Sequence, residues 1–298
     1  MNGILVIDKP ADYTSHDVVA RLRGLLKQRR IGHGGTLDPQ ATGVLPVLVG
    51  RATRACAYLL GDKEYLARLV FGVVTDTQDT GGAVECVSDR RPTRAELEAA
   101  LPAFRGEILQ VPPMVSAVKV GGRKLYELAR RGVTVERPPR PVTIHALTLE
   151  EMTADGCTLR VRASKGTYVR TLAHDLGQAL GCGAALSALR RTYAHPFSLE
   201  DAVTLEDVAA AGDSAGALLK PVDTLFADLP ALTAGPRDEA RCRVGAPFAA
   251  PPEAPPVGAL CRVYGAGGVF LLIGRVCAAD HGSVVRTEKN FFEVNADG

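Results

Sequence analysis

A glycine-rich loop around an Asp-Pro pair constrains this chain more than any other segment. The sequence GHGGTLDPQATGVLP occupies residues 32–46 and carries a single carboxylate, Asp38. Pro39 disfavours the helical backbone conformation at Asp38, while Gly35 and Gly43 permit tight bends and close approach of a ligand. An Asp-Pro pair by itself is a common start of a turn. In this long glycine-rich setting, the segment instead predicts a catalytic loop that presents Asp38.

Length and composition indicate an ordinary globular protein. The chain has 298 residues, 46% of them hydrophobic, which suffices for one large domain and a small one. The apolar run at residues 4–7 is too short for a signal peptide, and no apolar stretch approaches the length of a membrane span, so we expect a cytoplasmic protein. The 7 cysteines form no Cys-x-x-Cys pair, and the sequence therefore predicts neither a zinc site nor a disulfide framework.

The charge distribution points to a nucleic-acid partner only locally. A net charge of +2 is too small to indicate one. Two basic runs stand out, however, in residues 18–37, which contain no acid, and in residues 119–140. Charge alone favours two solvated faces over a binding surface. Because the first run leads directly into the Asp38 loop, we interpret both as surfaces for RNA.

Periodicity and capping patterns predict interleaved strands and helices. Residues 4–7 indicate a short buried strand, and alternating residues 65–71 and 157–163 indicate two further strands. Ser15 is expected to cap a helix whose apolar residues fall on one face. Capping boxes predict two more helices, one after Thr93 with Glu96 and one after Thr204 with Asp207.

The character of the chain changes near residue 225. After Pro230 the sequence is rich in proline and glycine, and residues 251–256 read as a stiff extended spacer. Residues 259–264 and 269–276 flank a glycine-rich turn and predict a β-hairpin. We therefore expect two domains, residues 1–225 and residues 226–298, the second being small and β-rich.

Several segments together resemble one enzyme family. The loop at residues 32–46 is similar to the active-site segment of bacterial tRNA pseudouridine synthases of the TruB type, which isomerise uridine 55 in the T loop. Further segments similar to this family occur in the same order, namely GILVIDKP at 3–10, KEY at 63–65, VPPMVSAVK at 111–119 and SKGTYVR at 164–170. The resemblance spans most of the first 220 residues.

The resemblance implies a fold and a reaction. The fold would be α+β, with a mixed, largely antiparallel sheet surrounded by helices, and a C-terminal β-rich module that by its position resembles a PUA RNA-binding domain. The reaction breaks the glycosidic bond, turns the base and rejoins it through C5, so no cofactor and no metal is expected. The expected partner is the T-stem-loop of tRNA, with the chain acting as a monomer.

The resemblance also implies roles for individual residues. Asp38 aligns with the catalytic aspartate, and Arg170 is expected to pair with it through a charge-assisted bond. Tyr65 is expected to stack on the target uracil, Tyr168 and Leu189 to line its pocket, and His33 to brace the gap left by the extruded base. The residues expected to touch RNA phosphates are Lys9, Arg29, Arg30, Lys119, Arg123 and Lys124.

The sequence also fits two other functions. The protein could assist tRNA folding, with isomerisation incidental or alongside it, or it could be the catalytic subunit of a guide-RNA-dependent complex. The lack of a long Lys-rich tail and the character of residues 92–140 favour the stand-alone enzyme. A nucleotide-binding loop is disfavoured because residues 32–35 lack the required glycine spacing and following lysine.

Overall fold

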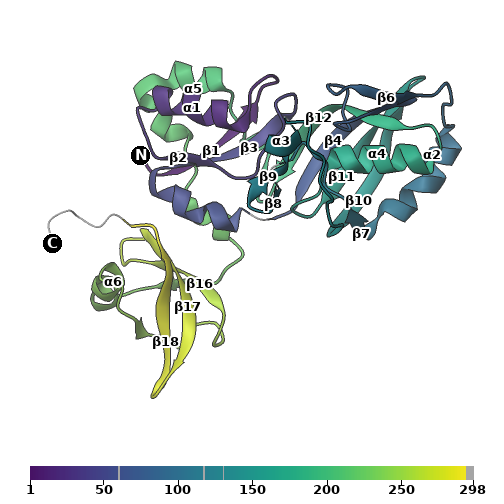
Figure 1. Cartoon of the computed structure of the whole chain (residues 1–298). Helices are drawn as coiled ribbons and strands as arrows, with labels where there is room; N and C mark the ends of the chain where they lie inside the picture. Colours follow the sequence, from purple (N-terminus) through teal and green to yellow (C-terminus); the bar gives the residue numbers. More distant parts are fainter. Residues whose placement is uncertain (60, 117, 130, 293–298) are drawn as a thin grey trace.

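The computed structural model describes residues 1–59, 61–116, 118–129 and 131–292. These residues form one large sheet flanked by helices and a second, smaller sheet built by the C-terminal part (Figure 1). The predicted fold class, α+β with a mixed and largely antiparallel sheet, is confirmed. Among the described residues we find no helix with the length and apolar character that crossing a membrane requires.

The large sheet positions most of the residues discussed below. Its 9 strands are β1 (Gly3–Lys9), β2 (Ile31–His33), β3 (Thr42–Val49), β4 (Lys63–Phe71), β7 (Gly106–Gln110), β10 (Arg140–Met152), β11 (Gly156–Ala163), β12 (Ala184–Ala194) and β13 (Phe197–Ser198). The spatial order is β1-β3-β12-β4-β11-β10-β7, with β2 added on β3 and β13 on β12. In the described part of this sheet, β3 and β12 form the one parallel pair, and Arg191 lies opposite Gly43 there. All other neighbours run antiparallel.

Side-chain alternation explains how the strands are buried. In β11, Leu159 and Val161 are buried while Arg160 and Arg162 turn outward, as the sequence pattern predicts. In β1 both faces are covered, because Leu5 belongs to one hydrophobic cluster and Ile4, its neighbour, to another. A strand buried on both faces appears in the sequence as a continuous apolar run.

Helices pack at both ends of the large sheet. The α-helices are α1 (Ser15–Leu25), α2 (Arg94–Ala100), α3 (Leu125–Ala129), α4 (Val169–Ala179), α5 (Leu205–Ala211) and α6 (Pro236–Arg243). Figure 1 shows α1 and α5 beside β1 and β3, and α2 and α4 at the opposite end. Shorter 3-10 helices are η1 (Gly50–Tyr58), η2 (Leu101–Phe104), η3 (Leu199–Asp201), η4 (Gly212–Leu218) and η5 (Val222–Phe226).

The predicted helix starts are confirmed with one correction. Thr93 and Thr204 cap α2 and α5 with complete capping boxes. The cap of α1 is Thr14, not Ser15, because the Thr14 hydroxyl accepts from the backbone N–H of Asp17 and the Asp17 carboxylate accepts in return. Ser15 is the first helical residue, and its hydroxyl is used elsewhere, as described below.

The smaller sheet comprises 5 strands from the C-terminal part. They are β14 (Ala231–Thr233), β15 (Phe248–Ala249), β16 (Leu260–Tyr264), β17 (Phe270–Ala279) and β18 (Gly282–Asn290), in the order β14-β16-β17-β18-β15. The hairpin predicted around residues 265–268 is confirmed as the antiparallel pair β16 and β17. The proline-rich residues 251–256 connect β15 and β16 and so lie inside this unit.

An aromatic cluster joins the small sheet to the large one. Phe226 of η5 packs edge-on against Tyr58 of η1, with ring centroids 5.0 Å apart, and against Phe291 at 5.9 Å. The Tyr264 hydroxyl donates to the Asp223 carboxylate over 2.7 Å. Together these three contacts link η1 and η5 to the C-terminal unit, which fixes the small sheet beside η1.

Two short hairpins complete the described fold. One joins β5 (Val73–Thr75) to β6 (Val84–Val87), and the other joins β8 (Lys119–Val120) to β9 (Arg123–Lys124). The first carries the turn with Asp79, and the second leads into α3.

Gly43, in β3 directly after the Asp38 loop, is a position where glycine is required. Its φ is +99°, and a Cβ there would collide with the backbone oxygen of Arg191 on β12. We expect Gly43→Ala to destabilise the protein by more than about 2 kcal/mol, because it adds a clash to an unfavourable backbone conformation. Gly106→Ala is the matched control, since φ is +80° but nothing lies within 4 Å of its Cβ. Urea unfolding measures both, and equal losses would contradict the clash.

Candidate active site

The Asp38 loop connects β2 to β3 and is anchored to the core and to α1. Leu37 and Ala41 are buried in the core on either side of Asp38. The buried Ser15 hydroxyl accepts the N–H of Leu37 over 2.9 Å and donates to its carbonyl over 3.2 Å. Asp38 itself keeps 46% of its side chain exposed. The loop is therefore fixed while the carboxylate remains available to a ligand.

Lys9 anchors the same loop from β1. Its side chain is fully buried, and its ammonium group donates to the carbonyls of Pro10, Tyr13 and Pro39. Burial lowers the pKa of Lys9 to about 8, while Asp12 and Asp38 act in the opposite direction. The expectation that Lys9 touches RNA phosphate is wrong for this structure, because all three of its protons are used inside the protein.

The lowered pKa of Lys9 predicts a pH-dependent stability. Between pH 8 and about 10.5 the unfolded chain binds a proton at Lys9 that the folded chain lacks, so the free energy of unfolding rises with pH in this window, by up to about 3 kcal/mol. Urea unfolding at pH 8, 9 and 10 should show a steeper rise for the wild type than for Lys9→Met. Parallel curves would contradict the assignment.

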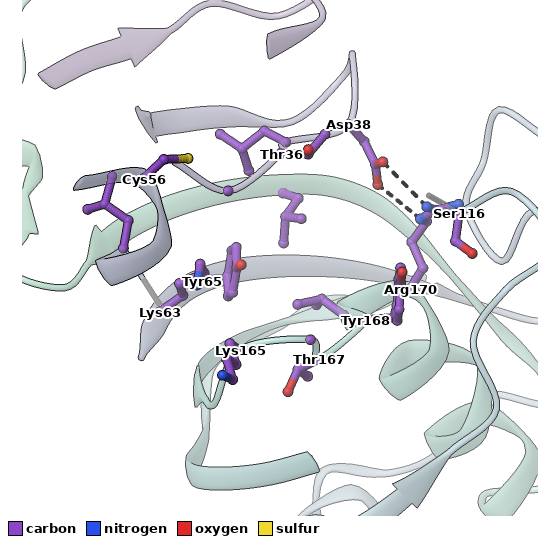
Figure 2. A pocket seen from close by; sticks show the side chains of 16 residues that line it. Thr36, Asp38, Cys56, Lys63, Tyr65, Ser116, Lys165, Thr167, Tyr168 and Arg170 are labelled. Carbon is purple, nitrogen blue, oxygen red and sulfur yellow. Dashed lines mark hydrogen bonds and ion pairs between the residues drawn. The ribbon is translucent and has the colours of Figure 1, made fainter. Parts of the chain in front are cut away.

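Arg170, in the first turn of α4, holds the Asp38 carboxylate in two places. Its Nε lies 3.0 Å from Oδ2 of Asp38, and its Nη2 lies 3.4 Å from Oδ1 (Figure 2). The guanidinium, only 5% exposed, also donates to the carbonyls of Thr77 and Val115 and lies 3.5 Å from the Asp79 carboxylate. A planar guanidinium fixed at five points orients the carboxylate that it pairs with.

A cavity of about 460 Å³ opens beside Asp38. Its walls come from the Asp38 loop, η1, β4, β12 and the loop that enters α4 (Figure 2). The lining residues are Gly35, Thr36, Leu37, Asp38, Cys56, Leu59, Lys63, Tyr65, Ser116, Lys165, Gly166, Thr167, Tyr168, Val169, Arg170 and Leu189. The structure thus brings Asp38, Arg170, Tyr65, Tyr168 and Leu189 together around one space.

The two tyrosines are held in different ways. Tyr65 is buried in β4, with Arg191 of β12 behind it. Tyr168 caps α4, and its backbone is clamped by the buried Gln110, whose side chain accepts from the Tyr168 N–H at 3.0 Å and donates to its carbonyl at 3.2 Å. Gln110 therefore fixes the direction in which Tyr168 enters the cavity.

Arg191 is a fully buried cation. Its Nε donates to the Val44 carbonyl over 2.6 Å and its Nη2 to the Gly35 carbonyl over 3.2 Å, so it ties together the two ends of the Asp38 loop. Its Nη1 has no hydrogen-bond partner among the described residues. Burial lowers the pKa of Arg191, and the Tyr65 phenol acts against this shift.

His33 lies outside the set of cavity-lining residues. Its ring meets that of His16 edge-on at 5.0 Å, and its Nδ1 has no partner within the described chain. Burial and the neighbouring His16 lower the pKa of His33 to about 4, so the imidazole is neutral at neutral pH. Across the described ranges, no group of three or more His, Cys, Asp or Glu side chains could hold a metal ion.

The remaining predicted RNA contacts lie on the surface. Arg29, Arg30 and Arg123 are exposed, and Arg30 is held by the hydroxyl of Thr53 at 2.7 Å. The side chains of Lys119 and Lys124 lie outside the described residues.

Comparison with known proteins places the chain in a family. Residues 23–169 match the N-terminal domain of TruB family pseudouridylate synthases, and residues 170–227 match the C-terminal domain of tRNA pseudouridylate synthase B. A tRNA pseudouridine synthase B from Stutzerimonas stutzeri (strain A1501) is 46% identical over 93% of this chain and 92% of its own. The chain belongs to the TruB family. The resemblance inferred from its motifs is thereby confirmed.

Other relatives agree. A tRNA pseudouridine synthase B from Symbiobacterium thermophilum (strain DSM 24528 / JCM 14929 / IAM 14863 / T) is 52% identical over 81% of each chain. Among solved structures, an H/ACA RNP bound to a substrate RNA containing 2'-deoxyuridine contains a chain of similar fold, with a TM-score of 0.74, 26% identity and coverage of 98% of this chain and 86% of that one. Strands β14 to β18 lie beyond the residues matched by the two TruB family models.

Sequence motifs alone did not single out several residues of this TruB family site. They are Lys63, Asp79, Gln110, Ser116, Lys165 and Arg191. Lys63 and Lys165 lie in the family motifs at 63–65 and 164–170, so their closeness in sequence to Tyr65 and Tyr168 indicates that they lie near the site. Asp79 and Gln110 carried no such signal, because they reach the site only through the packing of distant segments.

Proposed function

We propose that this protein isomerises uridine to pseudouridine at position 55 in the T loop of tRNA, with Asp38 as the catalytic carboxylate. The observation that carries the proposal is the half-exposed Asp38, held by the buried Arg170 at the edge of a cavity of about 460 Å³. This volume falls in the range of about 300–1,000 Å³ that is usual for small-ligand sites. Two relatives, 46% and 52% identical to the chain, are tRNA pseudouridine synthases B, which supports the choice of reaction and of tRNA.

The isomerisation needs only the substrate uridine, Asp38 and Arg170. The bond between C1' of the ribose and N1 of uracil breaks, the base turns, C5 bonds to C1', C5 loses its proton and N1 gains one. Asp38 meets the positive charge that develops on the ribose or forms a covalent bond to the substrate, as carboxylates do in glycoside cleavage. Arg170 keeps Asp38 aimed at the reacting atoms. No external reactant, metal or cofactor enters this balance.

The cavity walls suit a flipped pyrimidine. Tyr65 and Tyr168 offer aromatic surfaces on which a uracil can stack, and Leu189 adds an apolar side chain to the lining of the same cavity. A uridine stacked inside a folded T loop must leave the stack to reach Asp38. We assign His33, a neutral imidazole beside the loop, to bracing the RNA at the gap.

The proposal extends to the two domains and their partner. Residues 1–225 would form the catalytic domain, and residues 226–298 a PUA-like module that contacts the tRNA. The exposed Arg29, Arg30 and Arg123 would contact phosphates, which fix the register without reading the sequence. We propose that the chain acts as a monomer in the cytoplasm.

The test is conversion of an unmodified tRNA T-stem-loop by the purified protein alone, in the presence of EDTA. Carbodiimide labelling followed by primer extension locates the pseudouridine. We expect conversion at a single T-loop uridine. Binding without conversion, together with conversion once a guide RNA and accessory proteins are supplied, would move the assignment to a guide-dependent subunit.

A further inference from the structure

The end of the cavity away from Asp38 and Arg170 holds cations that the proposed chemistry leaves unused. Figure 2 shows Lys63 and Lys165 on the side of the cavity opposite Asp38. Lys63 extends from the first position of β4, and Lys165 comes from the exposed loop that enters α4. Two ammonium groups from unrelated segments therefore face the same space.

The buried Arg191 lies close to the first of these lysines, Lys63. The position that a Cβ on Gly35 would occupy is 3.3 Å from Cε of Lys63 and 3.7 Å from Nη1 of Arg191. The Lys63 stem and the Arg191 guanidinium thus approach the same point of the Asp38 loop. Nη1 is the atom of Arg191 that has no partner in the described chain.

Negative charge around this cluster is scarce. The Lys63 ammonium donates to the Gly61 carbonyl over 3.0 Å. The charged groups that act on it are the cations Arg191 and Lys165 and one acid, Asp62, which is itself 3.2 Å from the imidazole of His145. Burial and the two cations lower the pKa of Lys63 to about 8. Below this pH Lys63 is charged, and the nearby cations Arg191 and Lys165 act against that charge.

We propose that Lys63 and Lys165, backed by Arg191, form an anion subsite that holds a phosphodiester of the bound RNA beside the flipped uridine. The inference rests on the proposed function, because RNA supplies the phosphate. Ammonium groups bind phosphate as compact point charges. A phosphate held here would fix the ribose of the target nucleotide at one end of the cavity while Asp38 acts at the other.

The first test replaces the two lysines. In single-turnover conversion of the T-stem-loop, Lys63→Met and Lys165→Met should each raise the half-saturating protein concentration about tenfold and lower the salt dependence of binding by about 0.7 in log-log slope. The maximal rate should fall by a smaller factor than the affinity, because the lysines hold the phosphate and do not touch the reacting atoms. Lys63→Arg should recover most of the affinity. Arg94→Met, which removes a cation from the exposed surface of α2, is the control and should match the wild type.

The second test identifies the phosphate. A series of stem-loops is prepared, each with one uncharged methylphosphonate linkage next to a 2'-O-methyl sugar, at a different position near the target uridine. The control for each RNA has the same 2'-O-methyl sugar and an ordinary phosphodiester. In the wild type one linkage should cost about 100-fold in affinity, and the same substitution should cost only about tenfold in Lys63→Met, where Lys165 alone still holds the phosphate. If Lys63→Met folds poorly, the same comparison of methylphosphonate and phosphodiester RNAs is made with Lys165→Met, because Lys165 lies on an exposed loop.

The outcomes separate the subsite from the proposed function. If the wild type converts the unmodified stem-loop but the methylphosphonate penalty persists unchanged in both lysine variants, the subsite is overturned and the proposed function stands. If no linkage is sensitive in the wild type, the subsite is overturned as well. If no stem-loop is converted, fluorescence anisotropy on the same RNAs still measures the coupling, while the proposed function fails.

Discussion

Asp38→Asn should abolish conversion of the T-loop uridine, lowering kcat by about 10,000-fold or more, with tRNA affinity within about threefold of the wild type. The amide is nearly isosteric and still accepts a hydrogen bond from Arg170, so the loop should keep its structure. What it loses is the negative charge and the nucleophilicity that the reaction needs. Single-turnover kinetics with labelled stem-loop, together with anisotropy, measures both quantities.

Asp213→Asn provides the matched control for Asp38→Asn. It removes a carboxylate from a fully exposed position whose one ion pair, to Lys27, spans 3.7 Å. Its conversion rate should equal that of the wild type. Substantial activity in Asp38→Asn would exclude Asp38 as the catalytic group. If Asp38→Asn is inactive but fully restores tRNA folding, this result would support the additional folding role.

Arg170→Lys should lower kcat by about 100-fold to 1,000-fold while changing the affinity for tRNA much less. Lysine keeps the positive charge but cannot bridge both Asp38 oxygens and also reach Asp79 and the carbonyls of Thr77 and Val115. The carboxylate then samples orientations that do not face the substrate. The measurement is the split between the maximal single-turnover rate and the half-saturating concentration.

Arg160→Lys tests whether an arginine-to-lysine change is harmful in general. Arg160 also bridges two acids, Glu64 at 2.8 Å and Glu150 at 2.7 Å, but it lies on the outward face of β11 and does not line the cavity. We expect less than about a threefold change in rate, as for exposed ion pairs generally. If Arg160→Lys lost as much activity as Arg170→Lys, the effect could not be ascribed to orientation of Asp38.

Local patterns predicted much of the secondary structure. The boxes at Thr93 and Thr204 place their helices correctly, because a cap is satisfied within four residues. The cap of α1 was misplaced by one residue. Thr14 and Ser15 are both good caps, and only the contact between Ser15 and Leu37, 22 residues away, explains why Ser15 is used otherwise.

The adjacent arginines of β12 show where such patterns fail. In the sequence Arg190 and Arg191 form one basic pair. In the strand they point to opposite sides, so Arg190 pairs with Asp8 at 2.7 Å while Arg191 is fully buried. Lys9, expected at the surface, is buried for a similar reason, because its strand β1 has both faces covered.

The sequence by itself determined the family, the loop that presents Asp38 and most helix starts, because each of these depends on residue types at fixed short spacings. The family in turn implied the α+β class. The family resemblance predicts the pairing of Arg170 with Asp38, whereas only the tertiary structure decided that Lys9 and Arg191 also hold the loop. Asp38 and Arg170 are separated by 132 residues, and Gly35 and Arg191 by 156. Their contacts depend on the parallel register of β3 against β12 and on the placement of α4, and that register follows from packing across the whole sheet.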